Sequence, residues 1–228
     1  MYADDDTDNT SDIDPVILRN KIQKEADLSI SWVQDNKLVC SGAKTKLLVV
    51  GTRELRNSKL VKQNISLEIV VDGCKVVESK SERLLGFLVN NTLTWEHHLY
   101  GNQDNKGLID KLSLRAGLIT KLSRIMPTDR LKIMAEGIFF SVLNYGIELY
   151  ANTWSVMTQD EHLRNSTAYT KEDNRKLQVL VNKVLRSLTG LTFDTSTKLL
   201  HIRSNQLSVH QRCAYFSLVS IFKTLKRG

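Results

Sequence analysis

Residues 65–78, ISLEIVVDGCKVVE, decide the first half of the fold. Apolar residues alternate with other residues from position 65 to position 71, which is the period of a strand with one buried face. Asp72-Gly73 tolerates the positive φ angles of a tight two-residue turn, and a second strand is expected from Lys75 to Glu78. The stretch therefore predicts an antiparallel hairpin.

Further elements are expected on both sides of this hairpin. Asp14 followed by Pro15 is typical of an N-cap and a first helical residue, and the apolar spacing that follows predicts a helix to about Asp35. The short apolar run Leu47 to Val50 predicts a buried strand. The segment from Arg83 to Val89 predicts one further strand.

From about residue 105 the apolar residues recur at helical spacing. The polar stretch 155–174 predicts an exposed loop between helices. Four helices are expected: one that Pro127 stops, one that Thr128 caps, one that Gly190 stops and one that Ser208 opens. The sequence therefore predicts an α+β fold, with a mixed domain at 1–100 and an all-helical domain at 101–228.

The net charge of +7 is distributed unevenly along the 228 residues. The first 14 residues hold six aspartates and no Lys or Arg, a local charge of −6, so the remainder sums to +13. Residues 171–228 alone carry +8. A basic body of this kind suits a polyanionic partner, most simply nucleic acid. A solvated basic surface without a dedicated partner is an equally open reading.

Composition excludes several other classes of protein. No apolar run approaches the roughly 18 residues of a membrane span, and no secretory pattern opens the chain. The three cysteines are widely spaced, which is typical of buried thiols in a reducing compartment and not of a disulfide framework. We therefore expect an intracellular protein, cytoplasmic and nuclear, without a membrane partner.

The N-terminal stretch Tyr2-Ala3-Asp4-Asp5 is the sharpest chemical feature. Adjacent carboxylates repel one another, and they are useful where a divalent cation lies between them and a substrate phosphate. Two-metal phosphoryl transfer needs such ligands. A disordered acidic tail over residues 4–14 explains the same aspartates.

Several short segments, in order, resemble a known family. Tyr-Ala-Asp-Asp at 2–5 resembles motif C of reverse transcriptases. The segments WVQDNKL at 32–38 and KTK at 44–46 resemble the W-x-x-x-N-K-L and K-T segments of non-LTR, LINE-type and jockey-like retrotransposon polymerases. RLLGF at 83–87 is similar to the Y-L-G-V segment of the primer grip, and LTWEHH at 93–98 to an L-T-W-x-x-H segment.

The resemblance continues into the second half of the chain. Residues 117–154 are similar to the helical thumb, and LQVLVNKVLR at 177–186 resembles the L-Q-x-x-x-N-x-x-x-R region that follows it. The resemblance implies the C-terminal part of a polymerase palm followed by a thumb. The implied function is RNA-directed DNA synthesis, a nucleotidyl transfer on an RNA template and DNA primer duplex during retrotransposition.

The resemblance also implies roles for individual residues. Asp4 would be a principal ligand of Mg²⁺ and Asp5 an auxiliary one, with both acting in catalysis, and Tyr2 would lie near the incoming nucleotide. Lys44 would donate a proton to the pyrophosphate; the alternative is a surface lysine that caps a strand.

Two further groups of residues are expected to contact the nucleic acid. Leu85 and Gly86 would seat the primer, unless they are ordinary strand core with a glycine at a bend. Among the cations of residues 171–228, Lys183, Arg186 and Arg212 are expected to bind phosphates.

The chain also departs from the family pattern. Cys40-Ser41 replaces the usual L-N, and Met1 stands directly before Tyr2, so that the fingers and the motif A aspartate are not in the sequence. We therefore expect a polymerase fragment that is inactive alone. The alternatives are a non-catalytic helical module that binds nucleic acid, and an inert relic of a decayed element.

Overall fold

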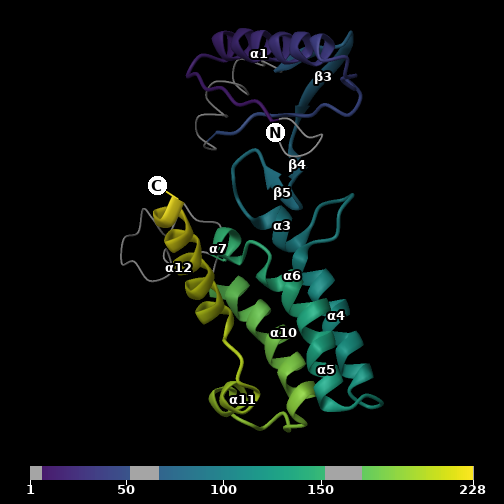
Figure 1. The fold of residues 1–228 in the computed structure, drawn as a ribbon, viewed down its shortest axis with the longest axis vertical. Helices are drawn as coiled ribbons and strands as arrows, with labels where there is room; N and C mark the ends of the chain where they lie inside the picture. The colour runs from purple at the N-terminus through teal and green to yellow at the C-terminus, as the bar shows by residue number, and fades with distance from the viewer. Residues whose placement is uncertain (1–6, 52–66, 152–170, 228) are drawn as a thin grey trace. The chain divides into compact units, whose positions relative to one another are not determined.

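The computed structural model describes residues 7–51, 67–151 and 171–227 and divides the chain into two compact units (Figure 1). Met1–Leu93 forms the first unit and Thr94–Gly228 the second. The first unit combines one long helix with short strands. The described residues of the second unit form helices and no β-strand. The structure is therefore of the α+β class, as the sequence predicts.

Helix α1 (Pro15–Asp35) begins where the sequence predicts. Oδ1 of Asp14 accepts hydrogen bonds from the backbone N–H groups of Val16, at 2.8 Å, and Ile17, at 3.2 Å. Pro15 occupies the first helical position, where its lack of an N–H group leaves no bond unmade. The predicted cap and both ends of the helix are confirmed.

The predicted hairpin is also confirmed. Strands β2 (Glu68–Val71) and β3 (Cys74–Ser79) pair antiparallel, and Asp72 and Gly73 between them have φ angles of 48° and 71°. Strand β1 (Leu47–Leu48) pairs parallel with β3, which gives the sheet the order β1-β3-β2. The apolar side of this sheet and helix α1 form the core of the unit.

Helix α1 also covers the free edge of strand β2. Gln23 donates from Nε2 to the carbonyl oxygen of Val70 at 2.8 Å and accepts from the N–H group of Val70 at 2.8 Å. Nε of Arg19 donates to the carbonyl oxygen of Glu68 at 3.2 Å. Unpaired backbone groups along an edge strand invite pairing with another chain, and these two side chains occupy them.

The prediction of a single strand from Arg83 to Val89 is wrong, because the segment forms a hairpin. Strand β4 (Ser81–Leu84) pairs antiparallel with β5 (Phe87–Asn90). Leu85 and Gly86 form the two-residue turn, with φ angles of 47° and 84°. Positive φ at both positions is the geometry of a type I′ turn, which leucine rarely adopts. For that reason propensity alone did not indicate a turn here.

The second unit is a helical assembly. Its described helices are α3 (Glu96–Tyr100), α4 (Leu108–Leu122), α5 (Thr128–Ala135), the π-helical turn η2 (Glu136–Phe140), α6 (Ser141–Asn144), α7 (Ile147–Tyr150), α10 (Lys171–Thr189), α11 (Thr197–Ser204) and α12 (Val209–Arg227). Helices α4 and α10 pack along one another in the middle of this unit (Figure 1). None of the described helices of the chain is long and apolar enough to cross a membrane.

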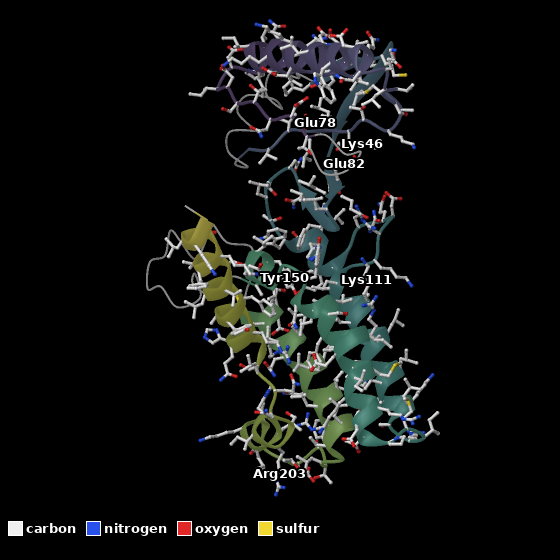
Figure 2. The ribbon with its side chains drawn as sticks, viewed as in Figure 1. Lys46, Glu78, Glu82, Lys111, Tyr150 and Arg203 are labelled. Carbon is white, nitrogen blue, oxygen red and sulfur yellow. The ribbon has the colours of Figure 1, made fainter. Side chains whose placement is uncertain are left out.

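Helix α10 carries the apolar stripe that the sequence predicts. Leu177, Val181, Val184 and Leu188 are all buried, and Gly190 ends the helix with a φ angle of 67°. Tyr150 of α7 is also fully buried, and it donates its hydroxyl hydrogen to the carbonyl oxygen of Leu143 (Figure 2). The helical periodicity thus located the core of the unit.

The helix after Pro127 contains the π-helical turn η2 between α5 and α6. A π turn changes the backbone pairing of a helix and can leave a carbonyl group without its usual donor. Arg115 of α4 donates from Nη1 to the carbonyl oxygen of Ile138 at 2.9 Å. Phe139 and Phe140 of the same turn are fully buried and meet edge to face, with ring centroids 5.2 Å apart.

Two expectations for the helical unit differ from the structure. Pro127, not Thr128, precedes α5 as its cap, and no side chain caps that helix. Of the loop expected at 155–174, residues 155–170 lie outside the described residues. Residues 171–174 form the first turn of α10 instead. Helix α11 was not predicted, although Oγ of Ser196 caps it by accepting from the N–H group of Leu199 at 3.4 Å.

Candidate nucleic-acid interface

The metal site expected near the N-terminus lies outside the described residues. Tyr2, Asp4 and Asp5 belong to the first six positions, so the Mg²⁺ hypothesis stays a prediction. Within residues 7–51, 67–151 and 171–227 no group of three or more His, Cys, Asp or Glu side chains could hold a metal ion.

The other predicted residues of the first unit lie in two turns. Lys44 has an exposed side chain, and its N–H group donates to the carbonyl oxygen of Ser41 at 3.0 Å. Leu85 is 53% exposed at the tip of the β4–β5 hairpin, beside Gly86. Leu85 is therefore not a core residue of a strand, and both turns present side chains at the surface.

Two predicted cations of the second unit lie one turn apart on helix α10. Lys183 is exposed, and Arg186 is half-buried. The guanidinium carbon of Arg186 is 5.1 Å from the centre of the Phe193 ring, and Nη2 donates to the carbonyl oxygen of Phe193 at 3.4 Å. Lys183 is thus directed to solvent, whereas Arg186 also holds the loop that follows the helix.

Arg212, expected to bind phosphate, is instead a buried structural residue that is only 6% exposed. Nε donates to the carbonyl oxygen of Leu207 at 3.2 Å, Nη1 donates to Oδ1 of Asn144 at 3.2 Å, and Nη2 donates to Oε1 of Gln206. The guanidinium lies over the Phe140 ring, 4.2 Å from its centre. Its hydrogen-bonding groups are thus directed into the fold and away from an external phosphate.

Electrostatics around Arg212 agree with this internal position. Burial lowers the pKa of the guanidinium, and the carboxylate of Glu136 acts in the opposite direction. Gln206 connects the two groups, because its Nε2 donates to Oε1 of Glu136 at 2.9 Å. The guanidinium group of arginine keeps its charge in proteins, so the network encloses a cation.

A second polar cluster, which the sequence reading missed, joins α3 to α10. The hydroxyl group of Tyr100 donates to Oδ1 of the buried Asp173, and Nζ of Lys176 donates to the Tyr100 oxygen at 3.1 Å. Partial burial, followed by the hydrogen bond to Asp173, raises the pKa of Tyr100. The hydrogen bond to Tyr100 raises the pKa of Lys176. Asp173 belonged to the stretch read as loop, so no sequence signal pointed to this cluster.

The cluster predicts a loss of stability at alkaline pH. A folded-state pKa raised above the unfolded value stabilises the fold below that value, and the stabilisation is lost as the pH rises through the raised pKa. For Tyr100, whose ordinary pKa is 10.0, the loss falls above about pH 10. We therefore expect the free energies of unfolding of the parent chain and of Tyr100→Phe to become more similar as the pH rises over that range. Urea unfolding at a series of pH values measures both free energies. Tyr215→Phe, which removes an exposed phenol from α12, should show no such convergence; equal behaviour of the two variants would contradict the assignment.

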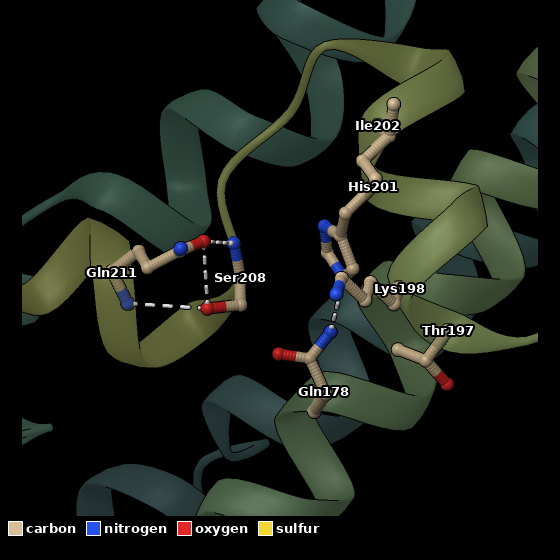
Figure 3. A pocket seen from close by; sticks show the side chains of 7 residues that line it. All are labelled: Gln178, Thr197, Lys198, His201, Ile202, Ser208 and Gln211. Carbon is tan, nitrogen blue, oxygen red and sulfur yellow. Dashed lines mark hydrogen bonds between the residues drawn. The ribbon is translucent and has the colours of Figure 1, made fainter.

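An open pocket of about 510 Å³ lies where α10, α11 and the start of α12 meet (Figure 3). Gln178 of α10 organises it: Nε2 donates to Oδ1 of Asn182 at 2.7 Å, and Oε1 accepts from the N–H group of Val209 at 2.9 Å. Nε2 of Gln178 also lies 3.0 Å from Nε2 of His201. One amide therefore ties three helices together.

The hydrogen bonds of His201 assign its tautomer. Nδ1 lies 2.9 Å from the carbonyl oxygen of Gln206, which can only accept, so Nδ1 carries the proton. Nε2 then accepts from the amide of Gln178 (Figure 3). Gln178 and His201 of this pocket are thus used within the fold, and Gln178 and Asn182, two residues of the segment that resembles the polymerase family, have structural partners.

The candidate residues that the structure describes are divided between the two units. Lys44, Leu85 and Gly86 belong to the first unit, and the cations of α10 belong to the second. Comparisons of the chain with protein-family models, with curated proteins and with solved structures found no match in any of the three.

Proposed function

We propose that the helical unit binds the phosphate backbone of nucleic acid, as the thumb of a reverse transcriptase of the non-LTR retrotransposon type. The observation that carries this proposal is the exposed position of Lys183 on α10, one turn before Arg186. Lys and Arg side chains at a helix surface contact phosphate oxygens and so position a protein on a nucleic acid without reading its sequence.

The charge of the surrounding segment supports the proposal. Residues 195–228 contain six Lys or Arg residues and no Asp or Glu. Figure 2 shows one of them, Arg203, at the far end of the unit on α11. Those with exposed side chains are Lys198, Arg203, Lys223 and Lys226. Arg175 of α10 contributes less to the positive charge of the surface, because Glu172 accepts hydrogen bonds from its Nε and Nη2 at 2.8 Å each.

The order of the family-like segments supports a role in RNA-directed DNA synthesis, with an RNA template and a DNA primer as partners. In that role Asp4 and Asp5 would hold Mg²⁺, and the exposed turn at Leu85 and Gly86 would meet the primer. The alternative is a helical module that binds nucleic acid without catalysis. Template-directed primer extension that is lost in Asp4→Asn would favour a polymerase that acts alone over the module. Binding without extension, unchanged by Asp4→Asn, is the result expected both of an inactive polymerase fragment and of the module.

We expect the full chain to bind duplex nucleic acid with a Kd on the order of 1–100 μM, in a manner that weakens steeply with salt. Lys183→Gln should weaken binding and reduce the slope of log K against log salt concentration by about one, because one phosphate contact is lost. Fluorescence anisotropy with a labelled duplex measures both quantities.

The matched control is Lys24→Gln, which removes the same charge from an exposed position on α1. It should leave the affinity and the salt slope unchanged. An affinity that does not depend on salt, or an equal effect of the two variants, would refute a phosphate-binding surface on α10.

A further inference from the structure

Phe193 lies in the loop between α10 and α11 and is 86% exposed, more than any other aromatic side chain that the structure describes. A single exposed apolar residue is common at protein surfaces and by itself indicates nothing. The surroundings of Phe193 distinguish it from such residues.

The loop holds the ring in a defined position. Gly190 ends α10 with a φ angle of 67° and donates its N–H group to the carbonyl oxygen of Arg186 at 2.9 Å. The N–H group of Thr195 donates to the carbonyl oxygen of Thr192 at 3.2 Å, which closes a four-residue turn. Phe193 is the second residue of that turn, so a short hydrogen-bonded structure presents its ring to solvent.

A cation lies against this ring. The guanidinium of Arg186 is 5.1 Å from the ring centre and also donates to the carbonyl oxygen of Phe193 at 3.4 Å. The exposed ammonium group of Lys183 lies one helical turn earlier. An aromatic ring with one cation beside it and a second nearby can hold both parts of a nucleotide, because a base stacks on the ring and its phosphate meets the cations.

The chemistry of the loop favours a single-stranded partner. In a duplex the faces of the bases are covered by stacking, so only an unpaired base can offer its face to a protein ring. The neighbours of Phe193 in its turn are Thr192, Asp194 and Thr195, which are polar. An apolar protein partner would have to remove these side chains from water without compensation.

We propose that Phe193 and Arg186 form a stacking site for an unpaired base of single-stranded nucleic acid. The proposal rests on the proposed function, because it assigns a particular ligand to the basic surface that Lys183 belongs to. It adds a preference between two forms of nucleic acid, which charge alone does not give.

The test compares the affinity of the full chain for a labelled oligothymidylate and for a labelled duplex, at one salt concentration. Phe193→Ala should weaken binding of the single strand by about fivefold or more, the usual effect of losing one base–aromatic stack. Its affinity for the duplex should not change. Phe193→Trp, which keeps a stacking surface, should retain the parent affinity for the single strand.

Phe222→Ala is the matched control, because it removes an exposed phenyl ring from α12, and it should change neither affinity. The proposal is overturned if Phe193→Ala affects both ligands equally or neither. If Lys183→Gln still weakens binding in that case, the proposed function stands and only the stacking site fails. If the parent chain binds neither the single strand nor the duplex, the proposed function and the stacking site are overturned together. If the ring serves to bind a protein partner instead, Phe193→Ala would leave the affinity for both nucleic acids unchanged.

Discussion

Arg212→Glu should lower the free energy of unfolding of the helical unit by about 3–5 kcal/mol, the range for leaving a buried charge without its partner. The acceptors on Asn144, Gln206 and Leu207 lose their donor. The new carboxylate would also face the negative side of the Phe140 ring, over which the guanidinium now lies. Urea unfolding followed by circular dichroism measures the change.

Lys183→Glu is the matched control, because it reverses a charge of the same sign at an exposed position of the same unit. Its effect on stability should stay within about 0.5 kcal/mol. Arg212→Lys keeps the charge but loses part of the planar set of donors, so it should fall between the parent and Arg212→Glu. A stable Arg212→Glu variant that has lost only its affinity for nucleic acid would contradict the buried network and restore Arg212 to the phosphate-binding set.

Gly107→Ala should destabilise the helical unit by about 3 kcal/mol, the upper end of the usual range for an overpacked site. A Cβ atom at this buried position would lie 2.4 Å from the carbonyl oxygen of Leu99, 2.4 Å from the carbonyl carbon of Tyr100 and 2.5 Å from the nitrogen of Gly101. All three are backbone atoms, which cannot rotate away as a side chain can. The approach of α3 to the start of α4 therefore depends on a glycine.

Gly117→Ala, the same substitution at another glycine, should instead raise the free energy of unfolding of the helical unit. Gly117 lies inside α4, and a Cβ atom there would meet nothing within 4 Å. Alanine in a helix interior is more favourable than glycine by about 0.5–1 kcal/mol. Thermal and urea unfolding of the two variants side by side check the pair, and a loss of stability in both would show that the contacts around Gly107 are not the cause.

Local sequence patterns predicted the elements whose signals are themselves local. The Asp14-Pro15 start of α1, the Asp72-Gly73 turn and the buried stripe of α10 all depend on neighbouring residues, and each is confirmed. The turn at Leu85 and Gly86 was missed, because leucine seldom adopts a positive φ and so gives no turn signal.

The candidate site was predicted less well, because charge counting ignores burial. Lys183 and Arg212 are equivalent in a count of cations, yet one is exposed on α10 and the other bonds to three residues inside the fold. Gln178 gives no signal of its own, since an amide that joins three helices is recognised only when the helices are in place. The side-chain environment, and not the residue type, separates the two roles.

The bonds that Arg19 and Gln23 make to strand β2 also determine how the three-stranded sheet can be enlarged. These side chains already use the outward N–H and C=O groups of Val70 and the carbonyl group of Glu68, so an added strand would find no ladder to continue on that side. On the opposite side of β3, strand β1 pairs only with Glu78 and Ser79. Among the described strands, growth of the sheet is thereby restricted to one direction, on the side of β3 where β1 lies.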